Sequence, residues 1–276
     1  IDASATAGWN DADTDTDVLE GFKPIGTYSN PDTSSFRGFF DGNGHTISGL
    51  IINRPGANDV GLFGCVGVGG RVRNLGLVGG AVTGYDRVGG LVGLNYEGTV
   101  SNCYATGAVT GRDAVGGLVG SNSSGTVSNC YATSAVSGTR YVGGLVGSNY
   151  SGTVSNCCAT GAVTGTGNYV GGLVGYNDYY GTVSNCYAAG AVTGDLCVGG
   201  LVGWNFSGTV SNCYATGAVT GDDYVGGLVG INDGTVSNCY ATGAVSGTGY
   251  YIGGLVADNY GTVSNSYWDM QTSGQS

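Results

Sequence analysis

Short β-prone runs, in which apolar residues alternate with small polar ones and which glycine or asparagine punctuates, recur along most of the chain at a nearly constant distance. In one copy these runs cover residues 88–92, 99–105 and 108–110, and they are rich in Val, Thr and Ala. Such residues favour β-strands, and no part of the repeat has the 3.6-residue period of an amphipathic helix. The pattern predicts three short strands per copy, with turns at the glycines and asparagines.

The length of one copy can be measured from a leucine in the segment Gly-Gly-Leu-Val. Successive leucines lie 27, 27, 28, 28, 27 and 27 residues apart, at Leu91, Leu118, Leu145, Leu173, Leu201, Leu228 and Leu255. Three strands with glycine corners fit one coil of a β-solenoid, in which coils stack about 4.8 Å apart. We therefore predict an all-β fold, a parallel β-solenoid (β-helix) with three-strand coils of about 27 residues. About eight full or partial coils would form a rod on the order of 40 Å long.

Alignment of the copies predicts which side chains face the core. The segment 74–77, Asn-Leu-Gly-Leu, aligns with Asn102-Cys103-Tyr104-Ala105. Because side chains alternate along a strand, Cys103 and Ala105 should point inward with the leucines, and Tyr104 should point outward. The expected inward ladders are the cysteines Cys103, Cys130, Cys157, Cys186, Cys213 and Cys239, with the valines equivalent to Val100 and Val109.

Two asparagines per copy mark corners. One ladder is Asn95, Asn122, Asn149, Asn177, Asn205, Asn232 and Asn259, and the other is Asn102, Asn129, Asn156, Asn185, Asn212, Asn238 and Asn265. Stacked amides can hydrogen-bond from coil to coil, and asparagine also satisfies backbone groups in turns. We expect a structural role for both ladders.

The chain divides into three parts by this pattern. Residues 1–60 are expected to form an N-terminal capping segment and the first coil, and residues 61–267 the solenoid repeats. Residues 268–276 are expected to be a C-terminal tail that continues in a longer chain.

Charge excludes some classes of partner. The net charge is −11, with eight Lys and Arg residues in total. No basic patch can be assembled from so few cations, so we expect no nucleic-acid partner. No run of 18 apolar residues is present, so we expect no membrane span.

The residues that could carry chemistry are few. His45 is the only histidine and lies in a glycine-rich turn, so no catalytic triad and no His-Glu-x-x-His zinc site is expected. Asp11, Asp13, Asp15 and Asp17 resemble part of a calcium loop. The EF-hand pattern fails, because Thr16 and Phe22 stand where it needs Gly and Glu. An irregular Ca²⁺ site and a solvated acidic loop both remain open, and no cofactor is expected.

The cysteine pattern lacks the C-x₂-C spacing of metal sites, so the inward cysteines are expected to be mostly free thiols that pack as small apolar groups. Cys158 occupies the outward tyrosine phase, and Cys197 occupies the phase of Tyr169 and Tyr224. These two are the expected exposed thiols.

Outward tyrosines form the candidate binding surface. One ladder contains Tyr104, Tyr131, Tyr187, Tyr214 and Tyr240, and the other contains Tyr141, Tyr169, Tyr224 and Tyr251. An exposed aromatic stripe can bind sugar rings or another protein. The alternative is that tyrosines stack on each other and only stabilise the sheet.

The repeat resembles a known family. The core Val-Gly-Gly-Leu-Val-Gly-x-Asn, followed by Val-Ser-Asn-Cys-Tyr-Ala-Thr-Gly, is similar to the GLUG-motif repeat over about residues 60–267, and the run Phe40–Ile47 is also typical of it. Such repeats occur in bacterial extracellular proteins, including haemagglutinin-like adhesins and the non-catalytic part of immunoglobulin A metallopeptidases. The resemblance implies an extracellular or cell-surface location. Because members often extend further in both directions, it also implies that both ends here are cut from a longer chain.

The expected function is an extracellular structural or adhesive module without catalysis, such as a stalk, an adhesin segment or a filament subunit. Its partner would be a protein or a carbohydrate at the cell surface, and head-to-tail self-association through the end near Trp268 is a further expectation. The alternative is a carbohydrate- or protein-binding domain attached to a secreted enzyme. Two further classes have less support. A flat Thr array would suggest ice binding, but the outward stripe of Thr99, Ser101 and their equivalents contains Ser as well as Thr. A polysaccharide-cleaving β-helix needs clustered charged residues, and here they are only 10% and scattered.

Overall fold

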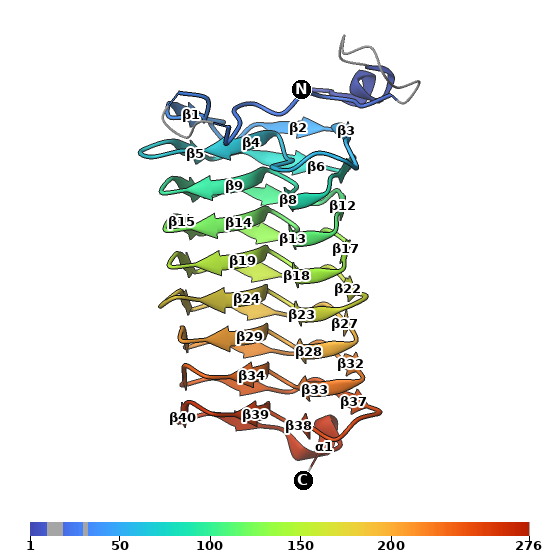
Figure 1. The fold of residues 1–276 in the computed structure, drawn as a ribbon, viewed down its shortest axis with the longest axis vertical. Coiled ribbons are helices and arrows are strands. Elements are labelled where there is room, and N and C mark those ends of the chain that lie inside the picture. Colours follow the sequence, from blue (N-terminus) through green and yellow to red (C-terminus); the bar gives the residue numbers. More distant parts are fainter. Residues whose placement is uncertain (10–18, 30–32, 276) are drawn as a thin grey trace.

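The chain folds into a rod of stacked coils (Figure 1), and the two ends of the chain lie at opposite ends of the rod. The structure is a computed structural model that describes residues 1–9, 19–29 and 33–275. Every strand pair in the solenoid is parallel, and each strand pairs with the equivalent strand one coil away. The prediction of an all-β parallel solenoid with coils of about 27 residues is confirmed.

The strands form five sheets that run along the rod, here called sheets I to V. Sheet I contains, in spatial order, β1 (Phe39–Asp41), β5 (Arg71–Arg73), β10 (Thr99–Ser101), β15 (Thr126–Ser128), β20 (Thr153–Ser155), β25 (Thr182–Ser184), β30 (Thr209–Ser211), β35 (Thr235–Ser237) and β40 (Thr262–Ser264). Sheet II contains β2 (Thr46–Ser48), β6 (Gly76–Val78), β11 (Tyr104–Ala105), β16 (Tyr131–Ala132), β21 (Cys158–Ala159), β26 (Tyr187–Ala188), β31 (Tyr214–Ala215), β36 (Tyr240–Ala241) and β41 (Tyr267–Trp268).

Sheet III follows along each coil and contains β3 (Ile51–Asn53), β7 (Ala81–Thr83), β12 (Ala108–Thr110), β17 (Val136–Gly138), β22 (Val163–Gly165), β27 (Val192–Thr193), β32 (Val219–Gly221) and β37 (Val245–Gly247). Sheet IV contains β8 (Asp86–Gly89), β13 (Asp113–Gly116), β18 (Arg140–Gly143), β23 (Asn168–Gly171), β28 (Leu196–Gly199), β33 (Asp223–Gly226) and β38 (Ile252–Gly253). Sheet V contains β4 (Phe63–Val66), β9 (Val92–Tyr96), β14 (Val119–Ser123), β19 (Val146–Tyr150), β24 (Val174–Asp178), β29 (Val202–Phe206), β34 (Val229–Asn232) and β39 (Val256–Asn259).

A complete coil therefore has five strands, and the prediction of three strands per coil is wrong. The run 99–105 is two strands, because Asn102 between them has a left-handed backbone with φ of 53°. The run 88–92 is likewise divided, because Gly90 and Leu91 lie between β8 and β9. A left-handed residue turns the chain sharply, so one apparent strand bends around a corner.

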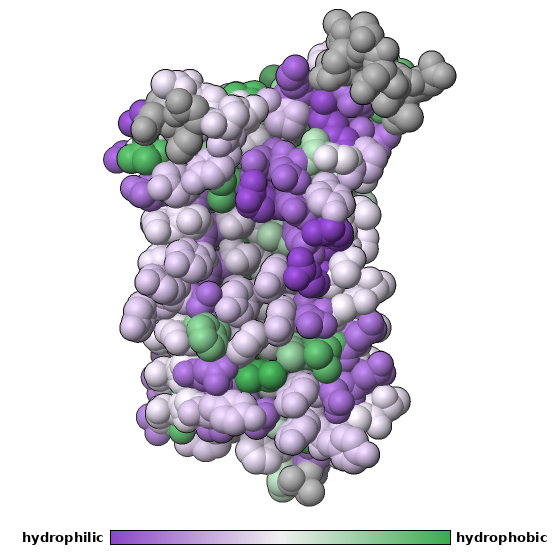
Figure 2. Space-filling model, viewed as in Figure 1, coloured by the Kyte–Doolittle hydropathy of each residue, from purple (hydrophilic) through white to green (hydrophobic). Residues whose placement is uncertain are grey.

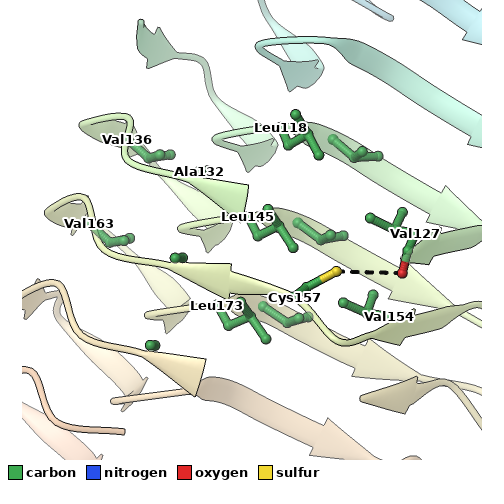
Figure 3. Close-up of a cluster of buried hydrophobic side chains, with 14 of the residues drawn as sticks. Leu118, Val127, Ala132, Val136, Leu145, Val154, Cys157, Val163 and Leu173 are labelled. Carbon is green, nitrogen blue, oxygen red and sulfur yellow. Dashed lines mark hydrogen bonds between the residues drawn. The ribbon is translucent and has the colours of Figure 1, made fainter. Parts of the chain in front are cut away.

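The interior is a set of identical side chains stacked along the rod (Figure 3). The leucines from Leu91 to Leu228 and the valines from Val100 to Val236 are fully buried, while Val263 of the last coil is partly buried. Cys103 and Ala105 are buried, as predicted, while Tyr104 between them is only half-buried. Each buried valine stabilises the fold by roughly 1.5–3 kcal/mol.

The first asparagine ladder is also buried. The side chain of Asn122 donates from Nδ2 to Oδ1 of Asn149 at 2.8 Å and also to the carbonyl of Gly125 at 3.0 Å, and the same pattern repeats from Asn95 to Asn232. This confirms hydrogen bonding from coil to coil. The second ladder has another role: Asn102 and its equivalents are exposed and occupy the left-handed corner, a conformation that asparagine tolerates better than most residues.

The two ends of the rod depart from the repeat. The N-terminal segment includes a short 3₁₀ helix, η1 (Ser4–Gly8), and touches the first coils through isolated bridges such as Asp2 to Ser48 and Ile25 to Phe63. At the other end, α1 (Met270–Ser273) follows the last strand. A hollow of about 320 Å³ remains there, and its wall includes Leu255, Trp268 and Gln275.

Candidate functional site

The outward tyrosines of sheet II stack face to face along the rod. Parallel in-register pairing places each ring directly above its equivalent, so the ring centres of Tyr104 and Tyr131 lie 4.7 Å apart with planes 4° apart. Tyr187, Tyr214 and Tyr240 form a second stack, with spacings of 5.0 and 4.9 Å. Inside such a stack a ring presents only its edge and hydroxyl to solvent, because its faces are covered by its neighbours.

The first stack begins at a position where the ladder lacks a side chain. Gly76 is in register with Tyr104, and the Tyr104 ring leans over it so closely that a Cβ atom on Gly76 would lie 2.3 Å from Cζ of the ring. Beside this position is a hollow of about 230 Å³, lined by Asn43, Gly44, Asn74, Leu75, Gly76, Asn102 and Tyr104. Sequence analysis named Tyr104 but missed the hollow. The signal that could have found it is the glycine in the tyrosine column.

The second tyrosine ladder lies on sheet IV and is part of a larger aromatic cluster. Tyr141 and Tyr169 stack at 5.4 Å, and both have a left-handed backbone. Their rings also contact Tyr176 and Trp204 of sheet V, at 5.0 to 5.7 Å between ring centres. Further along the rod, Tyr224 and Tyr251 stack at 4.6 Å with planes 4° apart.

Sequence analysis missed Tyr176 and Trp204, although they hold the cluster together. They occupy the outward position of Ser148 on the neighbouring strand, so the repeat varies there. Asp233 accepts a hydrogen bond from Nε1 of Trp204 at 2.5 Å. Burial and the nearby carboxylate of Asp178 raise the pKa of Tyr176 above its usual value.

Ion pairs also occupy sheet IV, beginning in the coil of Tyr141 and continuing toward the N-terminus. Arg140 binds both carboxylate oxygens of Asp113, at 2.9 and 2.6 Å, and Arg112 adds a third contact at 2.8 Å. Burial alone would raise the pKa of Asp113, but the hydrogen bonds from both arginines outweigh it and lower that pKa below its usual value. Figure 2 shows the resulting hydrophilic patch on the upper half of this face, with a more apolar area below it.

The two predicted exposed thiols differ in the structure. Cys158 is half-buried between Tyr131 and Tyr187 in the outward column, as expected from its phase. Cys197 is buried, with only 3% of its surface exposed, so the prediction of an exposed thiol is wrong there. Cys197 lies in β28 of sheet IV, in the column of Tyr169 and Tyr224, whose longer side chains are half-buried where the shorter cysteine is covered. Burial, followed by the charges of Asp223 and Asp258, raises the pKa of Cys197 to about 12.

The inward cysteines are free thiols that hydrogen-bond within the core. Sγ of Cys103 donates to the carbonyl of Ser101 at 3.2 Å, and the backbone N–H of Cys103 donates to Sγ of Cys130 at 3.4 Å. The hydrogen bond to Cys130 and burial raise the pKa of Cys103. These thiols are therefore packing groups of the core.

Asp11, Asp13, Asp15 and Asp17, the candidate calcium ligands, lie outside the described residues. Within residues 1–9, 19–29 and 33–275, no three His, Cys, Asp or Glu side chains are grouped so that they could hold a metal ion. Over the same residues, no helix has the length and apolar character needed to cross a membrane.

Comparison with known proteins agrees with this architecture. The sequence model of the family described as the GLUG motif matches six consecutive segments, at residues 84–110, 111–137, 138–164, 166–193, 194–220 and 221–246. The chain is 43% identical over 108 residues to halomucin from Haloquadratum walsbyi, which covers 38% of this chain and 1% of halomucin. It is 44% identical over 85 residues to a protein of Evansella cellulosilytica that carries the name Gly-rich membrane protein, covering 30% of this chain and 9% of that protein.

Among solved structures, a chain from Bacteroides ovatus that carries the name immunoglobulin A1 protease is similar, with a TM-score of 0.54 and 20% sequence identity. The alignment covers 94% of this chain and 74% of that chain. At this level of identity the likeness shows a shared fold. The matched curated relatives are far longer than this chain, which spans only a small part of either one.

Proposed function

We propose that this chain, which belongs to the GLUG-motif family, is a rigid module of a larger protein at or outside the cell surface, and that it has a structural and adhesive role without catalysis. The observation that carries the proposal is the unbroken register of the coils. The same residues meet across every interface of the repeats, from β10 with β15 to β35 with β40. Such an array transmits position and force along its length and keeps its outward surfaces in fixed columns.

The relatives support a surface location. They carry the names halomucin and Gly-rich membrane protein, and in both the matched region is a small part of a long chain. A module of this kind would act by spacing and presenting other parts of the protein. The adhesive role is supported by the half-exposed aromatic columns, because tyrosine and tryptophan are enriched at recognition surfaces.

The charged side chains support a non-catalytic role. Asp113, the most buried carboxylate described, is held by two arginines, and Asp41 is paired with Arg73 at 2.8 Å. A general acid or base needs a pKa close to the working pH. The two arginines lower the pKa of Asp113, and hydrogen bonds from Asn74, from the backbone of Asn43 and from Arg73 lower the pKa of Asp41.

The location can be tested on intact cells that express the full-length protein. An antibody against the folded rod should label unpermeabilised cells or the surrounding medium. Labelling only after permeabilisation would contradict the proposal.

The adhesive role is tested separately. Attachment is compared between cells that carry the full protein and cells whose protein lacks residues 84–246, the region matched by the family. Equal attachment would leave a spacer without an adhesive role.

A further inference from the structure

We propose that the outer surface of sheets IV and V in the C-terminal half of the rod binds an arginine-rich segment of a partner protein. This inference rests on the proposed surface role, because it names the kind of partner that the adhesive module would hold. The surface, here called the aromatic face, consists of two adjacent columns of side chains in the lower half of the view in Figure 1. Its sheet IV column contains Tyr169, Cys197, Tyr224 and Tyr251, and its sheet V column contains Tyr176, Trp204, Ile231 and Asp258.

Charge divides the rod into two unlike halves. All eight Lys and Arg residues lie at or before Arg140, whereas the chain after it contains seven aspartates and no cation. In the N-terminal half the carboxylates are paired within the chain, as Asp59 is with Arg87. None of the salt bridges of the described residues involves an aspartate after Arg140. The aromatic face therefore carries negative charge that no cation of the chain offsets, which favours a cationic partner.

The N-terminal half already shows how arginine fits a surface of this type. Next to β8, the guanidinium carbon of Arg112 lies 4.1 Å from the ring centre of Tyr85, and the same arginine binds Asp113 at 2.8 Å. Arg140 also binds Asp113, and its guanidinium carbon lies 5.6 Å from the ring centre of Tyr141. Arginine suits this double contact, because its planar guanidinium stacks on a ring while its N–H groups bind carboxylate oxygens.

The last coils keep the tyrosine and the aspartate of this arrangement but lack the arginine. Asp223 stands in the column of Asp113 and Arg140. Tyr250 follows Asp223 by the same 27 residues as Arg140 follows Asp113. Its backbone N–H donates to Oδ1 of Asp223 at 2.7 Å, and its side chain is 94% exposed. Asp223 therefore has a neutral backbone donor where Asp113 has two guanidinium groups.

The stack of Tyr224 and Tyr251 is the expected anchor for the first arginine. The two ring centres lie 4.6 Å apart, and Tyr251, at the end of the stack, is 45% exposed. The carboxylates of Asp258 and Asp223 lie close to the stack, where they add to the effects of burial and of Tyr251 in raising the pKa of Tyr224. Oδ2 of Asp258 is enclosed and accepts no hydrogen bond from the described part of the chain, so its charge attracts a cation to these rings.

The rest of the aromatic face extends the contact from one arginine to a segment. The ring centres of Tyr176 and Trp204 lie 5.5 Å apart, and each ring is hydrogen-bonded to a carboxylate, that of Asp178 and that of Asp233 respectively. The columns cover four coils spaced about 4.8 Å apart, so they span about 14 Å. About four residues of extended peptide have this length, and alternate side chains of such a peptide point to the same side. Two arginines two residues apart can therefore reach both ring groups.

Other occupants fit this surface less well. A second copy of the chain would bring Arg87, Arg112 and Arg140, which its own aspartates already hold, and two chains of net charge −11 repel each other. A neutral glycan would cover the rings but would leave the negative charge without a counter-charge. An anionic ligand would add to that charge.

The test is calorimetric titration of the purified chain with the blocked peptide (Arg-Gly)6, and with (Lys-Gly)6, (Glu-Gly)6 and cellohexaose for comparison. (Arg-Gly)6 should bind at least about fivefold more tightly than (Lys-Gly)6, because only guanidinium combines ring stacking with bidentate pairing. (Glu-Gly)6 and cellohexaose should not bind. Added sodium chloride should weaken the binding of (Arg-Gly)6, because the carboxylates supply part of the attraction.

Two matched pairs of variants locate the site. Tyr251→Ala should weaken binding of (Arg-Gly)6 about tenfold. Its control is Tyr240→Ala, which removes an equally exposed tyrosine (44%) from sheet II and should leave the affinity unchanged. Asp223→Asn should weaken binding about fivefold. Its control is Glu97→Gln, which removes one negative charge from an exposed corner of the N-terminal half and should have little effect.

Circular dichroism checks that each variant remains folded. The proposal is overturned if the folded chain does not bind (Arg-Gly)6, if (Lys-Gly)6 binds equally well, if cellohexaose or (Glu-Gly)6 binds instead, or if each control loses as much affinity as its partner. Self-association of the chain, detected by light scattering and lost in Tyr251→Ala, would assign the surface to a second copy and would also overturn it. Labelling of intact cells by the antibody is independent of these results, so a failed titration leaves the proposed location standing.

Discussion

At the scale of single residues, each coil places several non-glycine residues in the left-handed region. Besides the corner asparagines, these include Ser124, Tyr141 and Glu97, with φ values between 53° and 54°. A left-handed backbone costs a non-glycine residue about 1–2 kcal/mol, and asparagine pays less than most. The hydrogen bonds between coils offset the strain at these corners.

Ser124→Gly should therefore stabilise the rod. Ser124 is exposed and glycine adopts its φ of 53° without strain, so we expect the free energy of unfolding to rise by about 1 kcal/mol, measured by urea denaturation. The matched control is Ser128→Gly in the extended strand β15, where glycine should lower the stability by about 0.5–1 kcal/mol. Changes of the same sign in both variants would contradict the assigned corner.

The thiols should react in an order set by burial. Brief treatment of the native protein with iodoacetamide at pH 8 should label Cys158 first, because it is the half-buried thiol of the outward column. Cys197 should react slowly, since burial raises its pKa to about 12 and covers its sulfur. Peptide mass spectrometry gives the order directly, and a Cys158→Ser variant should lose the fast phase. Equal rates at the two sites would show that the column of Cys197 opens to solvent.

These two thiols also show how far alternation can be read from the sequence. The alternation rule placed Cys103, Tyr104 and Cys158 correctly because all three lie within or beside an extended strand. The expected exposure of Cys197 had another basis, its equivalence to Tyr169 and Tyr224. That register is correct, but the shorter side chain of Cys197 is buried at this left-handed position of β28. The residue type does not predict the left-handed backbone at this position, because tyrosine, alanine, arginine and cysteine all occupy it in different coils.

At the scale of elements, the strands are very short and each one depends on its equivalent in the next coil. β11 has only two residues, Tyr104 and Ala105, and it is held by parallel pairing with β6 and β16. Such a strand has no stability of its own. The buried asparagine ladder is therefore an important link, because it joins the turn of each coil to the turn of the next through side chains.

Asn149→Ala should cost about 3 kcal/mol of unfolding free energy. The change removes donors to the carbonyl of Gly152 and to Oδ1 of Asn177, and it takes from Nδ2 of Asn122 one of its two acceptors, leaving the bond to Gly125. Thermal or urea denaturation measures the loss. The comparison is Asn156→Ala, an exposed corner, where only the left-handed strain of about 1 kcal/mol should appear. Similar losses at both positions would mean that the buried amides contribute little beyond their corner.

The number of strands per coil was the part of the element description that the sequence did not yield. No glycine interrupts the β-prone run at 99–105, so a reading based on strand propensity merges β10 and β11. The sequence does contain a signal for the division between β10 and β11. An asparagine equivalent to Asn102 recurs at this corner, and asparagine tolerates a positive φ. The alternation of side chains also indicates a corner. Val100 and Cys103 are three residues apart and would face opposite sides of one straight strand, yet both face the core.

At the scale of the whole molecule, the rod is nearly one-dimensional, because each coil contacts its two neighbours and the repeats are interchangeable. The spacing of the leucines was sufficient to predict the number of coils and their order. The ends were not predictable in the same way. The N-terminal segment is held by isolated bridges, such as that of Gly21 with Ile52, and no repeated pattern specifies them.

Removal of one exact coil should therefore leave a folded rod. Deletion of residues 111–137, one family repeat, brings β8 against β18 and places Asp86 opposite Arg140, a favourable pair. We expect a β-rich circular dichroism spectrum and a length shorter by about 4.8 Å in small-angle scattering. Deletion of residues 111–123 alone should unfold the neighbouring coils, because about half a coil cannot restore the register. Equal tolerance of both deletions would contradict a register-dependent stack.

The direction of the interstrand hydrogen bonds has a mechanical consequence. In every sheet these bonds run along the rod, and the chain enters at one end and leaves at the other (Figure 1). Tension applied through the two termini therefore acts on the outermost coil first and peels it away while the coils behind it remain closed. Each peeled coil would release about 90 Å of extended chain, at about 3.3–3.6 Å per residue. A pulled rod would lengthen in a series of nearly equal steps and would absorb work at each one, as a shock absorber does.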